Sequence, residues 1–235
     1  MQFNIEKLLF FDVETVSRYQ DLDDLPKEEL KLWESYYDNF KERVTDKSKL
    51  PNPPSNLTKK EVYRQTAALF PEFGKVVCVS LGFVMKDGKT KFESFYGKNE
   101  VEILKKVREV FNKIDSMDFQ LCGQNIKNFD IPFLAKRFVI NGLKVPTIFP
   151  KHDTKPWELK VLDIKEIWSF GGKYGLSSLD LICMPLNIES PKNGDVKGNN
   201  VNSNFWVDNY EEIKDYCERD VKSLIDIIKK LNSNE

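Results

Sequence analysis

Two acidic side chains stand at the end of one of the most apolar runs in this 235-residue chain. Residues 8–11 read Leu-Leu-Phe-Phe, and Asp12-Val13-Glu14 follows directly. Such a run predicts a buried strand, and alternate residues of a strand project from the same face. Asp12 and Glu14 should therefore lie side by side next to hydrocarbon, where an unpaired charge loses roughly several kcal/mol of hydration. Either the strand ends in solvent, or a bound cation holds both carboxylates.

Composition and charge limit the class of protein. The chain is 40% hydrophobic and 31% charged, with 17 phenylalanines, which is typical of a globular fold with a substantial core. A net charge of −1 gives no electrostatic footprint for nucleic acid, but bound divalent cations would add positive charge locally. The four cysteines form no CxxC pair, which indicates buried free thiols in a reducing compartment. Residues 8–11 are too short for a signal peptide or membrane span, so we expect a cytoplasmic protein with no membrane partner.

The pattern of the chain predicts one α/β domain, residues 1–235, with a mixed sheet. Further strands are expected at residues 75–85, 90–96, 119–123 and 159–164. Asp87-Gly88 predicts a hairpin between the first two of them. Helices are expected at residues 100–114, 131–140 and 210–231, with one more starting at Ser177 as N-cap and a loop over 187–204.

Residues 17–70 differ from the rest because they are rich in charge and are interrupted by prolines. Two helices fit this region, at residues 27–44 and 59–69. Thr58 and Glu61 have the spacing of a capping box, which predicts the start of the second helix. We interpret residues 17–70 as a helical insertion on a sheet core.

Two more acids occupy positions that a metal-dependent hydrolase could use. Asp130 opens the helix expected at 131–140, where an N-cap role is the structural alternative. Asp220 follows Tyr216 by four residues in the last expected helix, so the two side chains share a helix face. The alternative for this pair is a core tyrosine next to a surface acid.

The order of these segments resembles the DEDD 3′–5′ exonucleases of the ribonuclease H-like (DnaQ-like) superfamily. The matching segments are Asp12-Val13-Glu14, Asn-x-x-x-Phe-Asp at residues 125–130, and Tyr-x-x-x-Asp at residues 216–220. The tyrosine is similar to the DEDDy branch, which includes the proofreading exonuclease domains of family A and family B DNA polymerases; the histidine branch would need histidine at Asp215. Residues 71–77 also resemble exonucleases related to family B polymerases. The resemblance implies a ribonuclease H-like mixed β-sheet flanked by helices, with a helical insertion after the first strand.

The resemblance also implies phosphodiester hydrolysis with two metal ions. Asp12, Glu14, Asp130 and Asp220 would hold two Mg²⁺ or Mn²⁺ ions, with Asp12 as the shared ligand. Paired ions of this kind stabilise both the attacking and the leaving oxygen. Tyr216 would orient the attacking water, since a tyrosine with a pKa of about 10 is a poor base at neutral pH. The product would be a 5′-mononucleotide from a 3′ end.

Substrate contacts are implied by the same resemblance. Thr15 and Val16 would pack against the terminal nucleotide, and Asn125 and Phe129 would contact the single strand, where a phenylalanine can stack on any base. Core packing is the alternative role of Phe129. The likeness to family B enzymes favours single-stranded DNA over RNA, and a DNA polymerase in trans is a candidate partner.

The sequence is compatible in part with three other functions. A 3′–5′ exoribonuclease would share the acids, because discrimination depends on contacts to the 2′-OH. A non-catalytic nucleic-acid-binding module could keep the fold. Residues 12–16 superficially resemble the Asp-x-Asp-x-Thr motif of haloacid dehalogenase-like phosphatases, but Glu14 replaces the second aspartate and that interpretation leaves Tyr216 and Asp220 unexplained.

Overall fold

The structure, a computed structural model, describes residues 2–45, 58–172 and 178–233. Its contacts divide the chain into two compact units. The larger unit combines residues 1–15 with residues 76–235, and the smaller unit contains residues 16–75. In the described part of the chain, no helix is long and apolar enough to cross a membrane.

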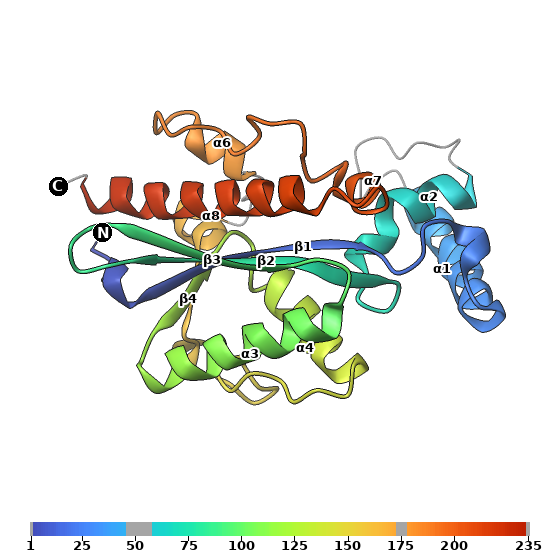
Figure 1. The fold of residues 1–235 in the computed structure, drawn as a ribbon, viewed down its shortest axis with the longest axis horizontal. Coiled ribbons are helices and arrows are strands. Elements are labelled where there is room, and N and C mark those ends of the chain that lie inside the picture. The colour runs from blue at the N-terminus through green and yellow to red at the C-terminus, as the bar shows by residue number, and fades with distance from the viewer. Residues whose placement is uncertain (1, 46–57, 173–177, 234–235) are drawn as a thin grey trace. The chain divides into compact units, whose positions relative to one another are not determined.

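A five-stranded mixed sheet forms the centre of the fold (Figure 1). Its strands are β1 (Leu8–Ser17), β2 (Gly74–Val84), β3 (Thr90–Tyr96), β4 (Gln120–Gly123) and β5 (Val161–Asp163), in the spatial order β3-β2-β1-β4-β5. β2 and β3 pair antiparallel, and Gly88 takes a φ of 79° in the expected hairpin. β1, β4 and β5 run parallel, with Leu121 opposite both Leu9 and Val161. The predicted mixed sheet is confirmed, with β1 as its middle strand.

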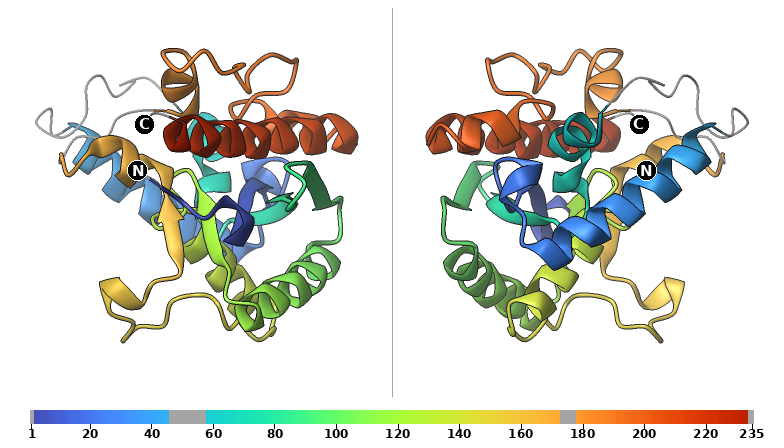
Figure 2. Two further views of the ribbon diagram at one scale, coloured as in Figure 1. Left: turned by 90° about the vertical axis from the view of Figure 1, so that its left-hand side faces the viewer. Right: turned by 90° about the vertical axis from the view of Figure 1, so that its right-hand side faces the viewer.

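The two faces of β1 are covered by different helices. Leu8 and Phe10 pack in one cluster with apolar residues of α8 (Tyr210–Asn232). Leu9, Phe11 and Val13 pack in another cluster, with residues of α3 (Glu100–Ser116) and α4 (Asp130–Ile140). Figures 1 and 2 show α8 on one side of the sheet and α3 and α4 on the other. Asp12 and Glu14 continue the alternation of Leu8 and Phe10, so the strand period directs them to the α8 side.

Close packing of α8 on the sheet depends on a glycine in β2. A Cβ atom at Gly82 would lie 2.6 Å from Cγ1 of Val221 and 2.9 Å from Cδ1 of Ile225. Because real Cβ atoms do not approach so closely, a larger residue would force these side chains or α8 to shift. The glycine therefore makes room for the side chains of the helix that bears Tyr216 and Asp220.

A buried ion pair connects α3, α4 and β2. The Glu100 carboxylate accepts hydrogen bonds from Nε of Arg137 at 2.8 Å and from the Val76 backbone N–H at 2.8 Å. Asn141 Nδ2 donates to the same carboxylate at 3.0 Å. Glu100 and Arg137 are almost fully buried, so this group fixes α4 with hydrogen bonds that water does not weaken.

Shorter helices complete the larger unit: α5 (Ile164–Ser169), α6 (Leu179–Cys183), α7 (Val201–Phe205) and the 3-10 turns Ile5–Lys7 and Pro156–Glu158. Ser178, not Ser177, is the N-cap of α6, because its hydroxyl accepts the Leu181 N–H. Ser177 lies outside the described residues. The loop expected over 187–204 ends earlier, because α7 begins at Val201. All four cysteines are free and buried, as predicted.

The smaller unit contains α1 (Lys27–Thr45), α2 (Lys59–Thr66) and the 3-10 turns Leu22–Asp24 and Ala67–Leu69. Thr58 and Glu61 form the predicted capping box, in which the Glu61 carboxylate accepts the Thr58 N–H at 2.7 Å. Trp33 is fully buried, and its ring lies 5.0 Å from the rings of both Tyr63 and Phe73. An aromatic cluster therefore forms the core of this unit.

Candidate active site

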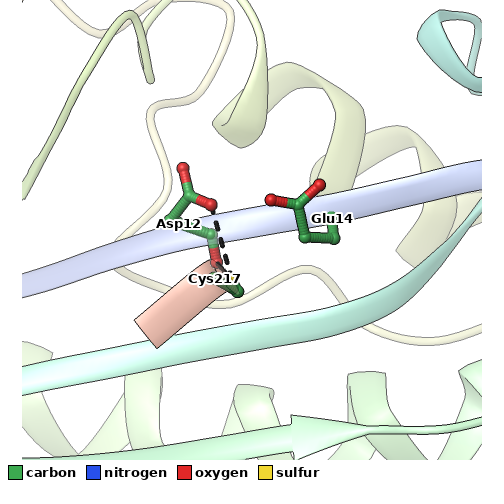
Figure 3. Close-up of side chains that lie close together, drawn as sticks. All are labelled: Asp12, Glu14 and Cys217. Atoms are coloured by element: carbon green, nitrogen blue, oxygen red, sulfur yellow. Dashed lines mark hydrogen bonds between the residues drawn. The ribbon is translucent and has the colours of Figure 1, made fainter. Parts of the chain in front are cut away.

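Asp12 and Glu14 project from β1, and Cys217 approaches Asp12 from α8 (Figure 3). One carboxylate oxygen of each acid and the Cys217 sulfur all lie within 4.8 Å of one another. The Cys217 thiol donates to Oδ2 and to the backbone carbonyl of Asp12, both at 3.4 Å. Glu14 is 8% exposed and Asp12 is partly buried. The strand therefore does not simply end in solvent at this point.

Tyr216 and Asp220 join this pair from α8. Each is 8% exposed, and the charge of Asp220 acts on the Tyr216 hydroxyl. The negative charge of Asp220 acts on Glu14, and that of Asp12 acts on Asp220. The alternative of a surface acid is wrong for Asp220, because α8 packs against the sheet and Asp220 is buried there.

Asp130 comes to the same place from the other helical layer. Phe129 occupies the N-cap position of α4, and Asp130 is its first helical residue. The N-cap alternative is therefore wrong. Asp130 is 4% exposed, and its charge raises the pKa of Asp12. Three separate elements thus bring four acids into one cluster, although they are far apart in the sequence.

Burial raises the pKa of every acid in this cluster. The pKa of Asp12 and that of Asp130 rise to about 7, and that of Asp220 rises to about 8, with loss of hydration as the largest cause. Burial and the charges of Asp12 and Asp220 raise the pKa of Glu14 well above its ordinary value. Burial and the nearby acids also raise the pKa of Tyr216, which keeps its hydroxyl protonated.

No lysine or arginine in the described part of the chain forms an ion pair with any of these four acids. Buried carboxylates that lie close together favour one another's protonated forms, and a bound cation would remove this effect. Carboxylate oxygens are the ligands that Mg²⁺ and Mn²⁺ prefer. The cluster has the donor set of a divalent metal site.

The residues expected to touch substrate differ in their exposure to solvent. Thr15 and Val16 follow the acids on β1, and both are buried. The Phe129 ring lies 5.5 Å from that of Phe133 and packs against the core, as its core-packing alternative predicts. Asn125 is partly exposed, with a left-handed backbone φ of 61°.

Two residues outside the predicted set contact it. Cys217 had a signal in the sequence, because it precedes Asp220 by three residues and therefore shares its side of α8. Asp163 is the last residue of the short strand β5 and the N-cap of α5, and it is 2% exposed. It accepts the backbone N–H of Asn125, and its charge raises the pKa of Asp130. Only the fold brings Asp163 to Asn125, since a single acid after a strand has many ordinary roles.

A mixed sheet with helices on both faces and this strand order defines an α/β fold of the ribonuclease H-like type. Residues 69–224 match the protein family described as "Predicted 3'-5' exonuclease related to the exonuclease domain of PolB". The match covers more than half of the chain, and the chain therefore belongs to this family. Asp130, Tyr216 and Asp220 lie within the matched residues, whereas Asp12 and Glu14 precede them.

Among solved structures, the chain is similar to the family B DNA polymerase of the hyperthermophilic archaeon Pyrobaculum calidifontis. The TM-score is 0.58 at 15% sequence identity, over 95% of this chain and 24% of the polymerase chain. The chain thus spans about a quarter of that polymerase's length, and the likeness is one of fold. No curated protein matches the sequence.

Proposed function

We propose that the chain is a metal-dependent 3′–5′ exonuclease that removes 5′-mononucleotides from the 3′ end of single-stranded DNA. One observation carries the proposal: the charges of Asp12, Glu14, Asp130 and Asp220 act on one another in a largely buried cluster, in a chain of an exonuclease-related family. The likeness to a family B DNA polymerase supports DNA as the substrate.

The donor chemistry of the cluster fits two Mg²⁺ or Mn²⁺ ions. Asp12, Glu14 and Asp220 would hold one ion, and Asp12 and Asp130 would hold the other. When bound, such ions activate water as a nucleophile and stabilise the oxygen that leaves. They would also offset the mutual repulsion that raises the pKa values of the four acids.

Tyr216 would position the attacking water. Its raised pKa keeps the hydroxyl protonated, so it does not act as the base. The charges of Asp220, Glu14 and Asp12 act on the hydroxyl, so it lies near the acids. A protonated hydroxyl there can donate to a water molecule and fix its direction beside the scissile phosphate.

Digestion of a 5′-labelled oligonucleotide tests the proposal. Wild-type protein with Mg²⁺ or Mn²⁺ should shorten the oligonucleotide stepwise from its 3′ end, and EDTA should abolish the reaction. Asp12→Asn should lower the rate by more than about 100-fold, because even outer partners of metal ligands contribute about 10–100-fold. Asp118→Asn is the matched control, since Asp118 is 89% exposed. Equal rates for wild type and Asp12→Asn would contradict the proposal.

The alternatives are separated by the same assay. Matched DNA and RNA oligonucleotides, each digested with Mg²⁺ and then Mn²⁺, distinguish an exodeoxyribonuclease from an exoribonuclease. A protein that binds either strand but cleaves neither with any metal would be a non-catalytic binding module. The place of the enzyme in proofreading, repair or nucleotide scavenging follows from its partners, of which a DNA polymerase is the first to test.

A further inference from the structure

A partly buried lysine in the first turn of α5 contacts the turn before α4 and has no acidic partner in the described part of the chain. Nζ of Lys165 donates to Oδ1 of Asn125 at 3.1 Å, and Lys165 forms no ion pair in the described part of the chain. Two neighbouring lysines differ: Lys127 pairs with Glu166 at 2.5 Å, and Lys160 pairs with two aspartates. The charge of Lys165 is therefore available to an anion from outside.

Asp163 fixes both residues of this pair. Its buried carboxylate accepts the backbone N–H of Asn125 at 2.8 Å, of Lys127 at 3.1 Å and of Lys165 at 3.0 Å. A carboxylate has about four acceptor positions, so three backbone groups use most of its capacity. Asp163 thus holds the turn after β4 against the first turn of α5.

The turn that Asp163 holds leads directly to the acid cluster. The Asn125 carbonyl accepts the N–H groups of Asn128 and Phe129, both at 3.1 Å, and Asp130 follows as the first residue of α4. Asn125 needs its left-handed conformation for this turn. Such a conformation persists in a residue other than glycine only when its surroundings enforce it. Asn125 and Lys165 therefore have a fixed position at the turn that leads into Asp130.

The donors of this pair suit a phosphate. Oδ1 of Asn125 accepts from both Lys165 and Asn128, which leaves its NH₂ group as a donor. The Lys165 ammonium has three N–H donors and uses one of them on Asn125. The acid cluster repels an approaching polyanion, so a cation where the strand approaches would offset this repulsion.

We propose that Lys165, held by Asn125, binds a backbone phosphate of the single strand whose 3′ end lies at the acids, and that Asp163 positions both residues. The inference rests on the proposed function and extends it to a named substrate contact. Contacts to phosphate position a strand without reading its sequence. The contact should therefore act equally on strands of every sequence.

The salt dependence of KM tests this contact. Each phosphate contact to a single strand contributes about 0.7 to the slope of log affinity against log salt concentration. Lys165→Gln should raise KM about 5–10-fold at low salt, leave kcat within about two-fold, and lower that slope by about 0.7. Lys165→Arg should keep the slope. Lys160→Gln is the matched control, because its charge is already paired with acids.

A second measurement tests the contact even if a variant is less stable or the protein does not cleave DNA. Fluorescence anisotropy of a labelled oligonucleotide in EDTA reports binding alone, and Lys165→Met keeps the aliphatic stem of the side chain. Asp163→Asn should shift KM and the slope in the same direction as Lys165→Gln, which a merely structural role would not do. Unchanged slopes in an enzyme that digests DNA would overturn this inference alone. A wild type that binds the strand but never cleaves it would refute the proposed function, while the anisotropy slope would still test Lys165.

Discussion

At the scale of single residues, the acids of the candidate site make the metal-free protein less stable. Asp220 has a pKa of about 8 in the fold against an ordinary value of 3.8. A carboxylate whose pKa is raised by folding binds its proton more tightly in the native state. Its contribution to stability is therefore full below about pH 4 and is lost as the pH rises to about 8. The chemistry that would bind metal thus opposes folding at neutral pH.

The direction of this pH dependence gives a prediction for the stability of the protein in EDTA. Its free energy of unfolding should fall between pH 5 and pH 8, and Asp220→Asn, which mimics the protonated acid, should raise it at pH 8 by about 1–3 kcal/mol. Urea unfolding at both pH values measures the change. Asp118→Asn should have no such effect, since Asp118 is exposed. A variant less stable than wild type at pH 8 would show that Asp220 does not oppose folding.

The second prediction at this scale concerns the role of the Tyr216 hydroxyl in catalysis. Tyr216→Phe removes only the hydroxyl, on which the charge of Asp220 acts. If the hydroxyl positions water, kcat should fall about 10–100-fold while KM stays within about two-fold. Steady-state digestion of a single-stranded oligonucleotide measures both constants. An unchanged kcat would assign Tyr216 to packing instead.

At the scale of elements, the Glu100–Arg137 pair holds α4, which carries Asp130. Glu100→Gln would leave the Arg137 guanidinium buried without its counter-charge, and removal of one partner of a buried pair typically costs about 3–5 kcal/mol. We expect a loss of this size in the free energy of unfolding, measured with urea. Glu28→Gln, at an exposed pair with Lys31, should change it by less than about 0.5 kcal/mol. Equal effects of the two substitutions would show that burial adds nothing to the pair.

Elements with strong local patterns were predictable. β3 runs over the predicted residues, and α8 ends one residue beyond its predicted end, because hairpin signals and apolar periodicity are properties of neighbouring residues. Short elements were less predictable. The N-cap of α6 is Ser178 and α7 begins at Val201, since brief helices depend on tertiary contacts more than on their own propensity.

At the scale of the whole molecule, metal binding should stabilise the fold. A ligand that binds only the native state adds about 2.7 kcal/mol when its concentration is 100 times Kd. Mn²⁺ should therefore raise the melting temperature of the wild type, measured by differential scanning fluorimetry. In Asp12→Asn most of this rise should disappear. A rise of equal size in both proteins would place the metal elsewhere.

The sequence alone determined the strand that carries Asp12 and Glu14, the helices that carry Asp130 and Asp220, and the family that their order resembles. Those features are local, since side-chain period and spacing are written in neighbouring residues. Only the tertiary structure decided that the four acids lie together in a largely buried cluster and that Cys217 and Asp163 contact the predicted site residues. The same holds for the unpaired charge of Lys165 beside Asn125. The physical reason is that burial and pairing depend on which distant segments pack against one another, and the chain folds those segments into one place.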